Sequence, residues 1–201
     1  FKLDCDPSRG GRGCFWLGYL HQFGDGGLAR DASEAMAKYQ LGCGVGEGDP
    51  EACRHLAEYS EHGVLVPRVE LGDGHDDAFS HDPTEAMDRF DQARRLWEAE
   101  CRAGDPESCK DAALLLWSGK SEAASPSGAA ELLGTSCDMG YAEGCHRLHQ
   151  LCVAAAKGAE RPPWAVACRG VELLRRACDG RSARGCIALG ELVEQREDKE
   201  R

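Results

Sequence analysis

Apolar and small residues recur along this chain at spacings of three and four residues, which is the pattern of helices with one buried face. Residues 32–41, 85–99 and 171–177 show it most clearly. Turn signals lie between such segments, where Gly ends one helix and Asp-Pro or a similar pair opens the next. These signals are Gly48-Asp49-Pro50-Glu51, Gly104-Asp105-Pro106-Glu107 and Gly140-Tyr141-Ala142-Glu143. The pattern predicts an all-α fold built from helical hairpins.

Ten of the twelve cysteines form pairs that recur along the chain: Cys5/Cys14, Cys43/Cys53, Cys101/Cys109, Cys137/Cys145 and Cys178/Cys186. The first members follow one another at intervals of 38, 58, 36 and 41 residues. A fixed period of this length is typical of stacked repeat proteins. A small residue precedes most of the second cysteines and Leu follows three positions later, as in Gly144-Cys145-His146-Arg147-Leu148. The interval of 58 residues indicates one insertion.

These signals predict a single repeat domain over residues 1–201, folded as a right-handed α/α solenoid of about four and a half hairpins. The predicted units are 1–27 (a half unit), 28–63, 64–120, 121–158 and 159–201, with the insertion at 64–82. In an antiparallel hairpin, residues at equal distances from the turn approach each other, and a disulfide needs Cα atoms only about 5.5 to 6 Å apart. We therefore expect each of the five pairs to be a disulfide within its hairpin. Each would contribute about 2.5 kcal/mol in the chain-entropy model.

The two remaining cysteines are Cys152 and Cys168, seven residues after Cys145 and ten before Cys178. We place Cys168 in the first helix of the last unit. The pair either bridges neighbouring units or remains as two free thiols. Zinc knuckles need cysteines two to four residues apart, and no neighbouring cysteines here are that close. So many paired cysteines indicate an oxidising compartment.

Charge and hydropathy exclude several kinds of partner. The net charge is −11 and the sequence pI is about 5.1, so the chain repels phosphate backbones and anionic lipid surfaces. We therefore expect no nucleic-acid partner. No apolar run reaches the roughly 18 residues of a membrane span. We expect no direct membrane span.

The paired cysteines, the Gly-containing turns and the small-Cys-x-x-Leu segments together resemble Sel1-like repeats, a cysteine-bearing group related to tetratricopeptide repeats. The segment Phe23-Gly24-Asp25-Gly26-Gly27-Leu28-Ala29-Arg30-Asp31 is most similar to the mitochondrial branch of this family. That branch assists cytochrome c oxidase assembly in the intermembrane space. The resemblance implies a non-catalytic scaffold that binds another protein, such as a respiratory-complex subunit. The alternative branch is the secreted or periplasmic cysteine-rich Sel1 proteins of bacteria.

One helical face offers candidate metal ligands. Cys145, His149 and Cys152 are spaced i, i+4 and i+7, which suits zinc or a haem iron. A haem- or metal-handling protein is therefore a further alternative, although a disulfide at Cys145 would remove its sulfur as a ligand. We favour the disulfide and expect neither metal nor cofactor. The glycine-rich run 42–48 follows a helix rather than a strand, so we interpret it as a turn and not a phosphate loop. No Ser-x-x-Lys or related nucleophile motif is present, and we expect no enzymatic activity.

The insertion is strongly acidic, with seven acids and no Lys or Arg between Arg68 and Arg89. Its acids and His75 and His81 could gather a hard cation, but their spacing is not that of a calcium loop. We interpret the insertion as a solvated loop that contacts a partner. The predicted partner contacts are Asp73, Asp76, Asp77, Asp82 and the loop residue Trp164. Trp16, Trp97 and Trp117 are expected to lie in the core or to line a groove.

Overall fold

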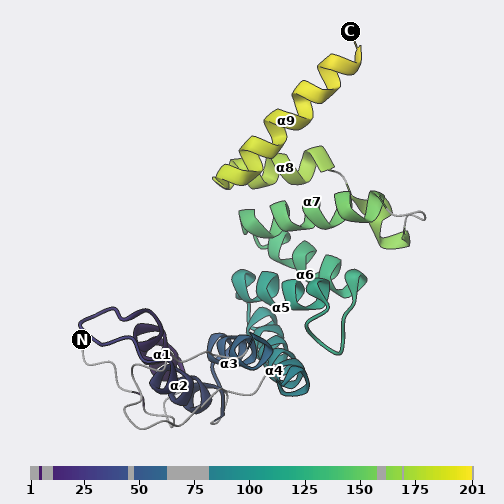
Figure 1. Ribbon diagram of the computed structural model, residues 1–201. Helices are drawn as coiled ribbons and strands as arrows, with labels where there is room; N and C mark the ends of the chain where they lie inside the picture. Colours follow the sequence, from purple (N-terminus) through teal and green to yellow (C-terminus); the bar gives the residue numbers. More distant parts are fainter. Residues whose placement is uncertain are drawn as a thin grey trace. The chain divides into compact units, whose positions relative to one another are not determined.

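The computed structural model describes Cys5 and residues 11–44, 48–62, 82–157, 162–168 and 170–200. Within these residues all regular structure is helical and no strand is present, so the predicted all-α class is confirmed (Figure 1). The chain divides into two compact units. The first comprises Phe1–Leu96 with Lys120–Glu122, and the second comprises Trp97–Gly119 with Ala123–Arg201. The prediction that the whole chain is one repeat domain stays a prediction.

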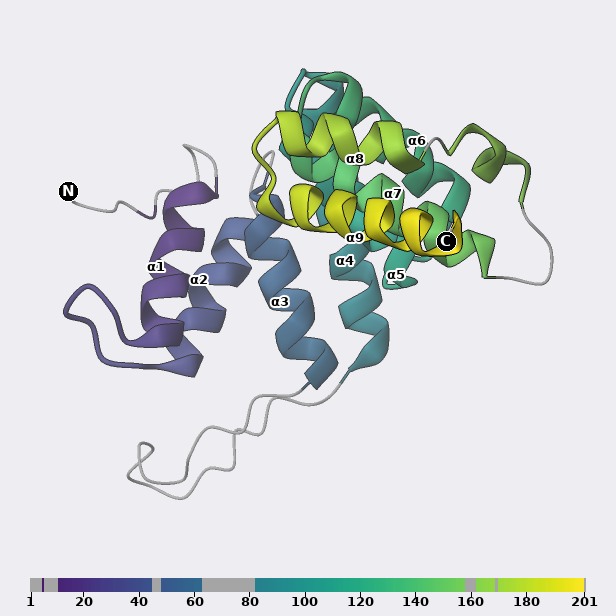
Figure 2. The ribbon, with the colours of Figure 1, turned by 90° about the horizontal axis from the view of Figure 1, so that it is seen from above.

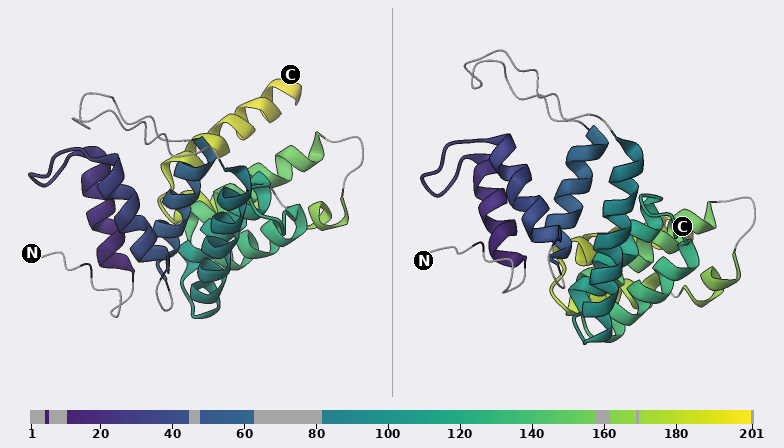
Figure 3. Two further views of the ribbon diagram at one scale, coloured as in Figure 1. Left: turned by 60° about the horizontal axis from the view of Figure 1, so that its bottom comes forward. Right: turned by 90° about the horizontal axis from the view of Figure 1, so that it is seen from below.

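The first unit is built on antiparallel helices that lie side by side (Figures 2 and 3). They are α1 (Arg12–Phe23), α2 (Ala32–Gly44), α3 (Pro50–His62) and the first part of α4 (Pro83–Arg102). The amide side chain of Gln92 on α4 donates to the Cys43 carbonyl at 2.9 Å, which ties α4 to the end of α2. Helix α1 stands alone before the first complete hairpin, as expected for the half unit.

The second unit continues the same alternation. It contains the end of α4, then α5 (Pro106–Ser118), α6 (Pro126–Asp138), α7 (Ala142–Ala156), the short 3₁₀ helix η2 (Pro163–Ala167), α8 (Gly170–Asp179) and α9 (Ala183–Glu200). One core cluster joins α5, α6 and α7 through Ala113, Leu116, Ala129, Leu133 and Leu151. A second cluster joins α6, α7 and α8 around two disulfides. Each hairpin therefore packs against the next along the chain.

All twelve cysteines lie within the described residues, and the structure pairs them in six disulfides. The five pairs within hairpins have Cα–Cα distances between 4.3 and 4.7 Å. The sixth, Cys152–Cys168, has a Cα–Cα distance of 5.9 Å. It links α7 to the residue that follows η2. Cys168 therefore precedes α8, whose first residue is Gly170, so its predicted position inside that helix is wrong.

Small residues before the second cysteine let the two helices of a hairpin approach closely. A Cβ atom at Gly144 would lie 2.7 Å from Cβ of Ser136, and one at Gly185 would lie 2.5 Å from Cβ of Ala177. Neither distance is possible between carbon atoms that are not bonded, so only glycine fits at these two positions. This close approach brings the cysteine Cα atoms within bridging distance. The small-Cys pattern in the sequence thus has a direct structural cause.

Helix starts follow the sequence signals. Asp49 Oδ1 accepts the backbone N–H of Ala52 at 2.9 Å, and Asp105 accepts the N–H groups of Glu107 and Ser108, both at 3.3 Å. Pro50 and Pro106 occupy the first helical positions, where a backbone N–H would have no intrahelical partner. None of the described helices combines the length and apolar character that a membrane span requires.

Candidate functional site

The predicted partner contacts of the acidic insertion are only partly visible. Asp73, Asp76 and Asp77 lie outside the described residues. Asp82 is described and half-buried, and its Oδ1 accepts the backbone N–H groups of Thr84 and Glu85, both at 3.0 Å. Asp82 therefore caps the start of α4. Its role as a partner contact stays a prediction, and its structural role is one that the sequence interpretation missed.

Trp164 lies in the 3₁₀ helix η2 and not in an irregular loop, which corrects the predicted placement. Its side chain is half-buried and packs against the core cluster of α5, α6 and α7. Trp117 packs against the same cluster, and Trp97 is only 4% exposed. Trp16, by contrast, is 47% exposed on α1. The tryptophans thus divide into three that contribute to packing and one on the surface.

The candidate metal ligands on α7 are not free to coordinate. Cys145 is bonded to Cys137 and Cys152 to Cys168, so neither sulfur is a thiolate. Of the three residues only His149 keeps a coordinating atom. Over the described ranges, no group of three or more His, Cys, Asp and Glu side chains is arranged to hold a metal ion. The residues present therefore do not fit a Cys-His-Cys metal or haem site.

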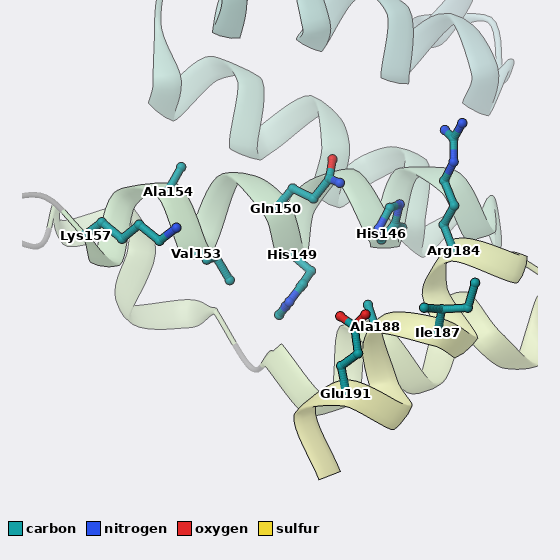
Figure 4. A pocket seen from close by; sticks show the side chains of 10 residues that line it. All are labelled: His146, His149, Gln150, Val153, Ala154, Lys157, Arg184, Ile187, Ala188 and Glu191. Carbon is teal, nitrogen blue, oxygen red and sulfur yellow. The ribbon is translucent and has the colours of Figure 1, made fainter. Parts of the chain in front are cut away.

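An open groove of about 720 Å³ lies between α7 and α9 in the second unit (Figure 4). Its α7 wall presents residues spaced three and four apart: His146, His149, Gln150, Val153, Ala154 and Lys157. Its α9 wall presents Arg184, Ile187, Ala188 and Glu191 with the same helical spacing. Both helices are the second helix of a hairpin. The repeat therefore brings equivalent faces of two successive hairpins together.

Apolar side chains at the groove remain open to solvent. Val153 is 41% exposed and Ile187 is 62% exposed, and they come from opposite walls. Figure 4 shows the His149 ring directed into the space between the helices, with Glu191 on the facing wall. Water contacts with apolar surface are unfavourable, so a ligand that covers Val153 and Ile187 would gain free energy. The groove is the candidate functional site.

The electrostatics of the groove differ from those of the whole chain. Burial lowers the pKa of His146 and also that of His149, so both imidazoles are neutral at physiological pH. Lys157 and Arg184 flank the groove, and Glu191 is its one acid. Arg184 Nη1 lies 3.5 Å from Glu143 Oε1, and its side chain is 69% exposed. The groove thus carries two cations against one anion, on a chain of net charge −11.

The sequence interpretation missed this groove because its walls are separated by some thirty residues. A signal was present in the spacing of His146, His149, Gln150 and Val153, which places them on one helical face. Ile187 gave a second signal, because it follows Cys186 at a position where the other complete hairpins carry Arg54, Lys110 and His146. Exposed isoleucine in place of a polar residue marks a surface that differs from its repeats.

The fold is similar to that of solved Sel1-repeat proteins. The protective antigen c5321 of uropathogenic Escherichia coli, described as displaying an SLR fold, aligns with a TM-score of 0.58 and 19% identity over 94% of this chain. A Sel1 repeat protein from Oxalobacter formigenes aligns with a TM-score of 0.55 and 16% identity over 92% of this chain. The chain spans 34% and 63% of the lengths of these two proteins. No protein-family model and no curated protein sequence matches the chain. The architecture is therefore that of the Sel1-repeat fold, stapled by six disulfides.

Proposed function

We propose that this protein is a non-catalytic scaffold that binds another protein through the groove between α7 and α9. The observation that carries the proposal is the exposure of Val153 and Ile187 on facing walls of an open groove. An amphipathic helix or an extended segment could cover both side chains. The flanking Lys157 and Arg184 favour a segment that carries acidic residues beside its apolar anchors.

The compartment is an oxidising one, because six disulfides in 201 residues persist only where thiols are not kept reduced. Within such compartments we propose the mitochondrial intermembrane space, with a role as assembly factor or peripheral subunit of a respiratory complex. Support comes from the resemblance of residues 23–31 and of the paired cysteines to the mitochondrial Sel1-like branch. The partner would then be a respiratory-complex subunit.

A second candidate is an exported bacterial protein of the periplasm or the extracellular space. It is favoured by the two solved Sel1-repeat structures above, which come from bacteria, one of them a protective antigen. Both candidates share the groove and the oxidising compartment. Fractionation of the source cells with protease protection separates them, because an intermembrane-space protein is protected until the outer membrane is opened.

The groove is tested with the double variant V153D/I187D. Immunoprecipitation from the source cells in mild detergent, quantified by mass spectrometry, should show at least a tenfold loss of the main partner. Met139→Asp is the matched control, because Met139 is 45% exposed in the same unit but does not line the groove. Unchanged thermal unfolding would show that both variants are folded. Retention of every partner by folded V153D/I187D would overturn the proposal.

The acidic insertion is proposed as an additional contact. Neutralising Asp73, Asp76 and Asp77 to Asn should slow association and flatten its salt dependence, because exposed charges steer encounter and are screened by salt. Asp82 is left unchanged in this test because it caps α4. Equal association rates across a salt series would show that the insertion makes no contact.

A further inference from the structure

A second surface appears when the hairpins are compared position by position. In the second helix of each complete hairpin, three residues lie on one face: the cysteine and the residues three and seven positions after it. We call these three residues the stacking ridge. The ridges are Cys53/Leu56/Ser60 on α3, Cys109/Ala112/Leu116 on α5, Cys145/Leu148/Cys152 on α7 and Cys186/Leu189/Val193 on α9.

The first three ridges are covered by the hairpin that follows. On α5, Leu116 packs in one cluster with Ala129 and Leu133 of α6. On α7, Cys145 and Cys152 pack with Leu173 and Ala177 of α8, and Leu148 packs against them. Burial follows from this packing. On α3 and α5 every ridge residue is 9% exposed or less, and Cys152 on α7 is 6% exposed.

The ridge on α9 has no such cover in the part of the chain that the structure describes. Val193 is 46% exposed, whereas its counterparts Cys152, Leu116 and Ser60 are 6%, 6% and 9% exposed. Cys186 and Leu189 are only half-buried. Figure 1 shows α8 and α9 as the last hairpin of the second unit, with no helix lying over α9 on the side away from α7. The surface used for stacking is therefore present here but unpartnered.

The helices that cover ridges share a sequence pattern. Each carries a small residue, a large apolar residue four positions later and a small residue seven positions after the first: Ala35/Tyr39/Gly42 on α2, Ala129/Leu133/Ser136 on α6 and Gly170/Leu174/Ala177 on α8. The small residues allow close approach to the preceding helix. A Cβ at Gly42 would lie 3.4 Å from Cβ of Cys14, and one at Gly170 would lie 3.3 Å from the His149 ring.

We propose that the α9 ridge docks a helix of another protein that carries this small–large–small pattern at i, i+4 and i+7. Continuity with the covered ridges supplies the geometry, because α9 repeats the residues that α7 offers to α8. A second copy of the chain is a poorer occupant, since α2, α6 and α8 already use this face within their own hairpin array. The ridge lies on a different face of α9 from Ile187 and extends the proposed protein-binding function to a second surface.

The test uses the chain's own segment 162–179 as a synthetic peptide, because it contains Cys168, Gly170, Leu174 and Ala177. Cys178 is replaced by Ser in the peptide. In the protein, Val193→Cys recreates the position of Cys152, so a docked peptide should form the counterpart of the Cys152–Cys168 disulfide. Glu194→Cys is the matched control, one position away and also exposed. In a glutathione redox buffer, capture at position 193 should exceed capture at 194 at least tenfold.

A peptide with Leu174→Asp should lose this preference, because its charged side chain cannot enter the apolar ridge. Peptide mapping without reduction checks that the six native disulfides are intact. Equal capture at both positions, or equal capture of the Leu174→Asp peptide, would overturn the proposal. Sedimentation of the wild-type protein provides the other arm. A dimer that Val193→Asp abolishes would show that a second copy covers the ridge, and would also overturn it. The groove variant V153D/I187D leaves the ridge unchanged, so the two binding surfaces fail independently.

Discussion

Around α1, α2 and α3 the first unit is packed with aromatic rings, whereas the second unit fills the space between its hairpins with Leu, Ala and disulfide sulfur. Tyr39 is fully buried, stacks on His55 at a centroid distance of 5.0 Å, and lies 6.2 Å from the Phe15 ring. In the second unit, Leu133 takes the corresponding place four residues before a helix-ending cysteine. Two fillings thus satisfy one hairpin geometry.

The aromatic filling brings polar atoms into the core that need partners. The Tyr39 hydroxyl donates to Gln22 Oε1 at 2.5 Å, and the Arg54 guanidinium lies 2.8 Å from His55 Nε2. The second unit has a different requirement, because small apolar residues bury less area per residue. It carries the additional Cys152–Cys168 disulfide between hairpins. The comparison teaches that the first unit depends on a packed polar-aromatic network and the second on covalent linkage.

The largest effect is expected from Tyr39→Ala. Removing a buried aromatic ring should cost about 4 kcal/mol, and the paired substitution Leu133→Ala should cost about 3 kcal/mol. Urea unfolding measures both, and hydrogen exchange locates them: Tyr39→Ala should expose amides of α1–α3, and Leu133→Ala those of α5–α7.

Tyr39→Phe keeps the ring and removes only the hydrogen bond to Gln22, so its cost should be about 1 kcal/mol. If Tyr39→Ala and Tyr39→Phe were equally destabilising, the hydrogen bond and not the ring would dominate this core. The contrast between the two units would then need a different explanation.

The double variant Cys152→Ser/Cys168→Ser tests the covalent half of the comparison. The two cysteines are 16 residues apart, so losing the bond should cost about 3 kcal/mol in the chain-entropy model. The increase in hydrogen exchange should be concentrated in α8 and the end of α7. An equal increase in α1–α3 would contradict the view that this bond stabilises only the second unit.

Much of this architecture was predictable because the hairpin leaves marks in the sequence. The disulfide requires two cysteines at equal distances from a turn, and the close approach requires Gly144 or Gly185 beside them. Asp-Pro pairs marked helix starts for the same local reason. The η2 turn was not predictable, because Pro162-Pro163 suits both an irregular loop and a 3₁₀ helix, and only packing of Trp164 on the core decides between them.

The groove and the aromatic cluster could not be predicted with the same certainty, because both depend on residues from helices that are distant in sequence. His55 shows the difficulty. Its position in the repeat resembles that of His146, yet His55 contacts Tyr39, Phe15 and Tyr19, and His146 lines the groove. Local pattern places both on a helix face, but only the neighbouring helices determine what that face meets.

His55 provides a test of the polar-aromatic network through pH. Burial, with a smaller contribution from the Arg54 charge, lowers the pKa of His55 from 6.5 to about 4. Between these values the unfolded chain binds a proton that the folded chain does not. Stability is therefore fully present above pH 6.5 and falls as the pH decreases toward 4. At pH 5 the loss should be about 2 kcal/mol, from about 1.4 kcal/mol per pH unit.

His55→Gln should remove most of this pH dependence, although it also changes stability at neutral pH. The measurement is urea unfolding between about pH 4.5 and 7.5, compared with wild type. His62, 70% exposed on the same helix, supplies the control variant His62→Gln, which should leave the slope unchanged. A wild-type slope retained in His55→Gln would assign the pH dependence to other groups.

The smallest expected effect concerns two helix caps that share the sequence Gly-Asp-Pro-Glu. Asp49 is 3% exposed and lies 3.5 Å from Arg12, whereas Asp105 is exposed. Each accepts backbone N–H groups at the start of its helix. Replacing a cap by Ala costs about 1 kcal/mol, and up to about 2 kcal/mol where the freed N–H groups are buried. Asp49→Ala should therefore be more destabilising than Asp105→Ala in urea unfolding. Burial raises the pKa of Asp49, which shows that its charge is costly there. Asp49→Asn keeps a capping oxygen and removes that charge, so it should recover most of the loss; failure to recover would mean that the ion pair with Arg12, and not the cap, stabilises this turn.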